Sequence, residues 1–138
     1  MLKKICAHVG CNAVIPAGQT YCDKHQCTYS HEIRRTIDRK YDTFYHSKEW
    51  RQLQQAVMQH YHGMCVYSYI VEHVVRQAGA VHHIVEVRDD YARRLDRSNL
   101  MPVSAAVHDG VIRQMYRQNK QSAQARLFQI LREWNEKF

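Results

Sequence analysis

No apolar stretch in the sequence approaches the ~20 consecutive residues that a membrane-spanning helix requires. The first residues, MLKKICAHVG, have a basic start but no apolar core of the length found in a signal peptide. Internal repeats and low-complexity segments are also lacking. We therefore expect an intracellular, cytoplasmic protein that has no membrane partner.

Acidic residues are outnumbered, with 13 Asp and Glu against 20 Lys and Arg, which gives a formal net charge of +7 at pH 7. This excess favours a polyanionic partner, most simply nucleic acid, although many basic proteins bind nothing anionic. The chain has 138 residues, 45% of them hydrophobic, which is enough for one compact domain with a small appendage.

Cysteine is nearly confined to residues 1–30, which hold four of the five cysteines. In a reducing compartment such a cluster favours metal binding over disulfides. Two close pairs of soft ligands suit tetrahedral Zn²⁺ and leave no open position for a substrate. The alternative is a set of free thiols beside a surface histidine. We predict one structural zinc ion, held by Cys6, Cys11, Cys22 and His25, with Cys27 as an alternative to His25.

Helical spacing dominates most of the remaining chain. After a basic, aromatic connector at 31–46, a helix begins at Ser47 and ends near Gly63. A second helix begins at Ser104, and an amphipathic helix forms the tail. Residues 65–80 satisfy both the helix and the strand pattern. The expected apolar stripes are Trp50, Leu53, Val57 and Tyr61; Val107, Val111 and Met115; and Leu127, Leu131, Trp134 and Phe138.

Two adjacent histidines interrupt an apolar run, VHHIVEV (81–87), which is rich in β-branched residues and predicts a strand. Adjacent side chains of a strand point to opposite faces, so His82 and His83 should not bind one metal in the same way. If both are functional, they have two different roles, and alternation alone does not assign them. The structural alternative is a satisfied pair without chemistry.

Asn99 and His108 are the further candidates. Asn99 follows His83 by 16 residues and His108 follows nine later, so that a strand, a long loop, a second short strand and a helix can bring them together. A metal could then lie between two histidines. The alternatives are a turn residue at 99 and an exposed helical histidine at 108.

The run VHHIVEV…RLDRSNLMPVSAAVH resembles the HNH endonuclease motif, whose members read roughly D/H-H-I, then N-L, then a helical His. The upstream FYHSKEWRQLQQAV resembles the segment preceding the motif in phage-type HNH nucleases, and some of those proteins carry a similar Cys/His cluster. The likeness covers about residues 6–112. It implies a ββα-metal (His-Me finger) core, which we place at 63–120. Together with the zinc-binding module at 1–30, the connector and helix at 31–62 and the C-terminal helix at 121–138, this predicts an α+β, mainly helical fold.

By this resemblance His83 is the general base that activates water, a task suited to an imidazole whose ordinary pKa is about 6.5. His82 and His108 would hold one catalytic divalent cation that polarises the scissile phosphate. Asn99 would fasten the loop and orient His83. Many relatives carry Asp where this chain has His82, and imidazole favours Mn²⁺, Ni²⁺, Co²⁺ or Zn²⁺ over Mg²⁺.

A second zinc site of many relatives, made of two C-x-x-C pairs, cannot form in this chain. The corresponding residues are CVYS (65–68) and SAAV (104–107), so three of the four thiols are missing. We predict that Cys65 is a buried thiol. Packing and the N-terminal zinc must then hold the fold at this point.

The expected partner is double-stranded DNA, bound through phosphate contacts with weak sequence preference. A setting with phage terminase and packaging proteins is implied by the resemblance, and the protein can be a monomer or a dimer. The alternative for the arginines is a solvated surface, with some pairing to Asp89, Asp90 and Asp96. The candidate contacts are Arg34, Arg35, Arg39 and Lys40 before the first helix, and Arg88, Arg93, Arg94 and Arg97 in the loop between His83 and Asn99.

Two other functions compete with the nuclease. One is a zinc-containing DNA-binding module whose nuclease site has decayed, which the missing thiols motivate. The other is a protein-interaction adaptor that uses the C-terminal helix, residues 127–138. The intact histidines and Asn99 favour the nuclease.

Overall fold

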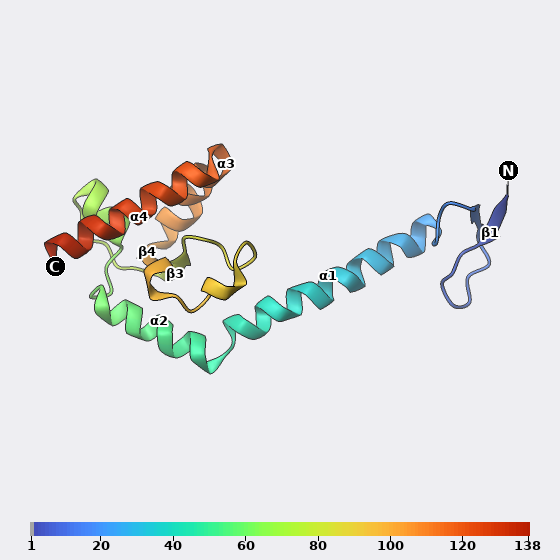
Figure 1. The fold of residues 1–138 in the computed structure, drawn as a ribbon, viewed down its shortest axis with the longest axis horizontal. Coiled ribbons are helices and arrows are strands. Elements are labelled where there is room, and N and C mark those ends of the chain that lie inside the picture. Colours follow the sequence, from blue (N-terminus) through green and yellow to red (C-terminus); the bar gives the residue numbers. More distant parts are fainter. Residues whose placement is uncertain (1) are drawn as a thin grey trace. The chain divides into compact units, whose positions relative to one another are not determined.

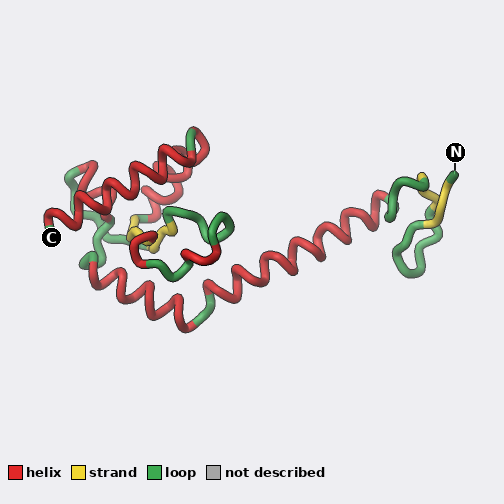
Figure 2. Tube along the Cα trace, viewed as in Figure 1, coloured by secondary structure: helices red, strands yellow, loops and turns green. Residues whose placement is uncertain are grey.

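A computed structural model describes residues 2–138, apart from the side chains of residues 27–32. The chain is α+β and mainly helical (Figure 1; Figure 2). It divides into two compact units, Met1–Phe44 and Tyr45–Phe138. No helix within the described residues is both long and apolar enough to cross a membrane.

The first unit has little apolar core of its own. Strand β1 (Lys3–Ile5) pairs antiparallel with β2 (Val14–Pro16), and helix α1 (Asp23–Tyr45) follows. Ile15 is buried, whereas Val9 of the same hairpin is 93% exposed. Helix α1 also includes residues 31–45 of the expected connector.

Helix α2 (Lys48–His60) opens the second unit with the predicted cap. The backbone N–H of Trp50 donates to the Ser47 hydroxyl oxygen at 3.2 Å, which satisfies one of the free amides of the first turn. Beyond the helix, Gly63 adopts φ +67, a left-handed conformation that glycine takes without steric cost. Trp50, Val57 and Tyr61 are buried, as the helical spacing predicted.

Strands β3 (Ala80–His83) and β4 (Leu100–Val103) form an antiparallel hairpin in which His83 lies opposite Leu100. The predicted strand at 81–87 is therefore too long, because pairing stops at His83. Beyond that point the Asn99 side chain binds the backbone of Val85 and replaces the strand ladder. Helix α2 packs against this hairpin (Figure 1).

The helix after β4 contains a π-helical turn, Val107–Ile112, and continues as α3 (Arg113–Gln118). Ser104 caps it, since the N–H of Val107 donates to its hydroxyl oxygen at 3.2 Å. The predicted stripe placed Val111 behind Val107 at α-helical spacing, but the buried partner of Val107 is Ile112. A π-helical turn bonds residues five apart, which moves the buried face by one residue.

Helix α4 (Lys120–Lys137) packs along α3, and the two join at Asn119 (Figure 2). Leu127, Leu131 and Trp134 lie in the core as predicted, whereas Phe138 is 62% exposed. The apolar stripe of the tail thus serves mainly the core of this unit.

The position of the missing second zinc site is occupied by packed side chains. Cys65 is a free and fully buried thiol, as predicted. The buried hydroxyl of Ser68 lies 3.2 Å from Cys65 Sγ and 3.0 Å from Glu72 Oε1, at the start of a π-helical turn, Ser68–Glu72. Val107, the fourth residue of the two pairs, is buried.

Candidate active site

Three cysteines and a histidine converge near the loop that joins β1 to β2. The ligand atoms of Cys6, Cys11, Cys22 and His25 all lie within 4.8 Å of one another. His25 presents Nδ1, at 3.2 Å from Cys22 Sγ and 3.6 Å from Cys6 Sγ. The side chain of Cys27, the alternative ligand, lies outside the described residues. Sulfur and imidazole donors in this number suit zinc, so the chain has a Cys₃His cluster able to hold such a metal.

The pKa of the Cys6 thiol favours metal binding. Burial raises it, but the backbone N–H of Cys22, the His8 backbone, His25 and the Cys22 thiol outweigh burial and bring it to about 6. Thiolate is the form that binds metal. The ring of His8 stacks on His25 with centroids 3.9 Å apart, and so limits the rotation of that ligand.

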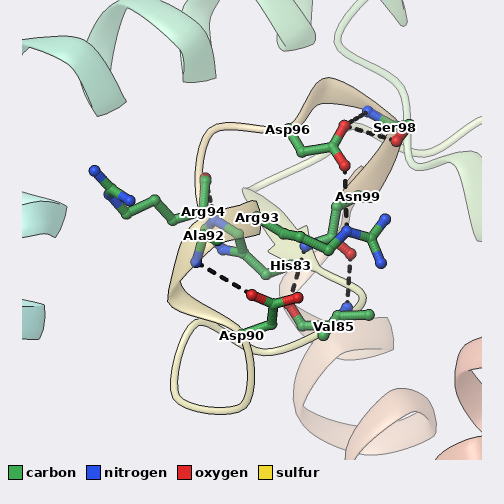
Figure 3. A network of polar contacts seen from close by, with 9 residues as sticks. All are labelled: His83, Val85, Asp90, Ala92, Arg93, Arg94, Asp96, Ser98 and Asn99. Atoms are coloured by element: carbon green, nitrogen blue, oxygen red, sulfur yellow. Dashed lines mark hydrogen bonds and ion pairs between the residues drawn. The ribbon is translucent and has the colours of Figure 1, made fainter.

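His83 lies in an aromatic pocket at the end of β3. Its ring stacks on Trp50 with centroids 4.7 Å apart, and Tyr45 meets it edge-on at 6.0 Å. Its Nε2 lies 2.9 Å from the carbonyl oxygen of Arg94 (Figure 3). Because a carbonyl only accepts, Nε2 must carry the proton, and Nδ1 is then the basic nitrogen. Burial lowers the pKa of His83 despite this bond, so the ring is neutral at pH 7.

His82, on the opposite face of β3, meets His108 from the π-helical turn. Their ring centroids are 5.2 Å apart. Burial, with electrostatic repulsion from the nearby His108 and His83 rings, lowers the pKa of His82 to about 3. His108 Nδ1 donates to Asp109 Oδ1 at 3.1 Å, which leaves Nε2 for a ligand. Two imidazoles facing one another suit a divalent transition metal.

Tyr116, on α3, touches the other side of His82. Its hydroxyl lies 3.1 Å from His82 Nε2 and 2.5 Å from the carbonyl oxygen of Ile84. Burial and the nearby carboxylates of Glu86 and Asp89 raise the pKa of Tyr116, so its hydroxyl stays protonated.

Asn99 holds the backbone that follows His83. It is fully buried and makes both side-chain bonds to Val85: the Val85 N–H donates to Oδ1 at 2.7 Å, and Nδ2 donates to the Val85 carbonyl at 2.9 Å (Figure 3). The N–H of Ile84 also donates to the Asn99 carbonyl at 2.9 Å. The amide therefore positions the chain two residues beyond His83.

Replacing Asn99 by alanine should lower the free energy of unfolding by about 2 kcal/mol or more. Both Val85 groups would lose their partner, and an unpaired buried polar group costs about 1–3 kcal/mol. Urea unfolding monitored by circular dichroism would measure the loss. The exposed neighbour gives a matched control, since Ser98→Ala should change stability by no more than about 0.5 kcal/mol. Equal losses of stability in the two variants would contradict the conclusion that the Asn99 amide stabilises the fold by pairing the Val85 backbone.

The loop between His83 and Asn99 uses several of its charged side chains internally. Arg93 pairs with Asp96 at 3.2 Å, and Asp96 also accepts from Ser98 (Figure 3). Arg94 donates to the Tyr91 carbonyl at 3.0 Å. Asp90 accepts from the N–H of Ala92, and Asp89 pairs with Lys120. Of the expected pairs between loop arginines and these acidic residues, Arg93–Asp96 is present, whereas the partner of Asp89 is Lys120 of α4.

The other candidate arginines are exposed: Arg88 and Arg97 in the loop, and Arg34 and Arg35 on α1. Arg97 lines a pocket of about 240 Å³ together with Val57, His60, Tyr61, Ser98 and Asn135. No acidic side chain is among these lining residues. The pocket therefore presents positive charge and polar groups beside the loop.

Three contacts of the histidines were not predicted from the sequence. They are the stacking of Trp50 on His83, the hydrogen bond from His83 to the Arg94 carbonyl, and the contact of Tyr116 with His82. Helical spacing places Trp50 in the apolar stripe of residues 47–63 and indicates no further role for it. A backbone carbonyl leaves no residue-type signal, and Tyr116 follows His82 by 34 residues with no spacing rule that links them.

Comparisons with known proteins support a nuclease-like fold. Residues 1–55 match a family model described as a domain of unknown function, DUF8602. No curated protein matches the chain. The structure is similar to that of an HNH endonuclease from the deep-sea thermophilic bacteriophage GVE2, determined with a manganese ion. The match has 26% sequence identity and a TM-score of 0.56, and it covers 64% of this chain and 96% of the phage enzyme. This similarity suggests nuclease activity.

Proposed function

We propose that this protein is a metal-dependent DNA endonuclease that hydrolyses phosphodiester bonds with His83 as its general base. The proposal rests mainly on one observation: three histidines lie at the end of β3, two on one face of the strand and one on the other. His82 and His108 face each other, while His83 lies on the other face of β3 with one nitrogen tied to the Arg94 carbonyl. Similarity to a manganese-bound HNH endonuclease supports this class, and β3, β4 and the following helix would be its ββα-metal core.

His83 would act through Nδ1, because Nε2 is committed to the carbonyl of Arg94. A water molecule would give a proton to Nδ1 as its oxygen adds to the phosphorus and the phosphodiester P–O bond breaks. The departing oxygen takes a proton from solvent, and His83 returns its proton to solvent. Stacking on Trp50 and the edge contact with Tyr45 keep the ring in one orientation during the reaction.

His82 and His108 would hold one divalent cation. When bound, such an ion polarises the scissile phosphate and stabilises the leaving oxygen. The chain supplies only two imidazoles at this point among its described residues, so the substrate and water would complete the ligand set. Asn99 would keep the loop in register through Val85 and so preserve the spacing between base and metal.

Double-stranded DNA is the proposed substrate. Arg88 and Arg97 are exposed in the loop between His83 and Asn99, and Arg34 and Arg35 are exposed on α1, so each can reach a phosphate. Arg93 and Arg94 are partly committed to the loop itself and contribute less. Binding through such contacts should weaken as salt rises.

Plasmid nicking tests the proposal and its metal preference together. We expect nicking that stops with EDTA and is several-fold faster with Mn²⁺, Ni²⁺ or Co²⁺ than with Mg²⁺ at equal concentration. The reason is that Mg²⁺ prefers oxygen ligands, whereas His82 and His108 offer nitrogen. Equal or better activity with Mg²⁺ across a titration would contradict the two-imidazole site. A chain that binds DNA without cutting it in any of these metals would instead be the decayed DNA-binding module.

A further inference from the structure

The hydroxyl of Tyr116 bridges two acceptor-capable atoms near the strand end. It lies 2.5 Å from the Ile84 carbonyl oxygen and 3.1 Å from His82 Nε2. Two oxygens approach this closely only when a proton lies between them. A carbonyl has no proton to give, so Tyr116 donates its single hydroxyl proton to Ile84.

This assignment decides the protonation of His82. With its proton committed to Ile84, the Tyr116 oxygen can only accept from the imidazole. His82 Nε2 must therefore be the donor and carry hydrogen, and Nδ1 is left with a free lone pair. A neutral imidazole binds a metal through its unprotonated nitrogen.

We propose that Tyr116 is a positioning residue that holds His82 as the Nε2–H tautomer, so that Nδ1 is the atom that binds the catalytic cation. The inference rests on the cation site of the proposed function. It makes Tyr116 the counterpart of Asp109, which accepts from Nδ1 of His108 and leaves Nε2 of that ring for the same ion. Partners of this kind orient a metal-binding histidine and set its basicity.

Gln124 offers a matched control within the same network. Its Nε2 donates to the same Ile84 carbonyl oxygen at 3.1 Å, from helix α4. Gln124→Met removes a hydrogen bond to that oxygen and leaves the hydroxyl beside His82 in place. Tyr116→Phe keeps the aromatic ring and removes only the hydroxyl. An effect that comes only from losing a hydrogen bond to the Ile84 carbonyl should appear in both variants. A change in the tautomer of His82 should appear only in Tyr116→Phe.

The first measurement is the side-chain ¹⁵N NMR spectrum of histidine in the full-length protein. One equivalent of Zn²⁺ fills the cysteine cluster, and no other metal is added. We expect His82 to be the Nε2–H tautomer in the wild type and in Gln124→Met, and a mixture of tautomers in Tyr116→Phe. An Nδ1–H tautomer in the wild type, or an unchanged tautomer in Tyr116→Phe, would overturn the assignment without reference to metal or DNA.

The second measurement is Mn²⁺ binding to the same three proteins by titration calorimetry. Tyr116→Phe should bind Mn²⁺ about 10–100-fold more weakly, the usual consequence of losing such a partner, and Gln124→Met should bind as the wild type does. Equal affinity of Tyr116→Phe and wild type would overturn the positioning role. A wild type that shows the Nε2–H tautomer but binds no Mn²⁺ would overturn the cation site itself, which separates failure of the proposed function from failure of the tautomer assignment.

Discussion

His83→Ala should lower the rate of plasmid nicking by about 10²–10⁴-fold, the range that a positioned general base contributes. The ring is 5% exposed and its pKa is lowered by burial, so it is neutral and ready to accept a proton at pH 7. Its Nε2 donates to the Arg94 carbonyl, so the basic nitrogen is Nδ1. Single-turnover nicking under saturating Mn²⁺ would measure the loss.

Loss of packing must be separated from loss of the base, because alanine also removes the ring that stacks on Trp50. His83→Gln keeps a side-chain donor that can reach the Arg94 carbonyl, yet it has no basic nitrogen. It should be as slow as His83→Ala while unfolding closer to wild type. His46→Ala, at an exposed histidine of the same unit, should cut normally. Metal-dependent nicking that survives in both His83 variants would refute the proposed mechanism.

The arrangement of the histidines about β3 could be anticipated because it depends on a local rule. Alternation along a strand put His82 and His83 on opposite faces, and the structure brings His108 to the former and Trp50 to the latter. Helix α2 and its Ser47 cap could be predicted for a similar reason, since capping and apolar spacing depend on residues close together in the sequence.

The features that escaped prediction depend on tertiary contacts. The strand ends at His83 and not at Val87. The Asn99 side chain, which follows a long loop, forms hydrogen bonds with both backbone polar groups of Val85, so these groups cannot pair with another strand. The π-helical turn buried Ile112 in place of Val111, since its spacing departs from the 3.6-residue period on which the prediction relied. The same turn precedes Tyr116, whose contact with His82 no α-helical pattern indicates.

Removing the metal from the Cys₃His cluster should unfold the first unit and leave the second folded. The first unit buries few apolar side chains: Leu2, Ile5, Val9 and Val14 are between 60% and 93% exposed. Structural zinc contributes an apparent free energy of about 10–16 kcal/mol in comparable small modules, far more than so small a core can supply. Hydrogen exchange with and without a strong chelator would show the loss of protection in Lys3–Ile5 and Val14–Pro16.

Cys22→Ser should reproduce the effect of the chelator, because Cys22 Sγ lies 3.2 Å from His25 Nδ1 and 3.9 Å from Cys11 Sγ, at the centre of the cluster. Native mass spectrometry should find one zinc ion per wild-type chain and none in this variant. Cys65→Ser is the matched control: its thiol is buried in the second unit and accepts a hydrogen bond from the Ser68 hydroxyl, so zinc content should not change. Protection of the first hairpin that persists in chelator would mean that packing, and not metal, holds this unit together.

Because Tyr45–Phe138 forms a compact unit of its own with the three histidines, nicking by the metal-depleted chain should return on adding Mn²⁺ if the cluster serves only as a structural element.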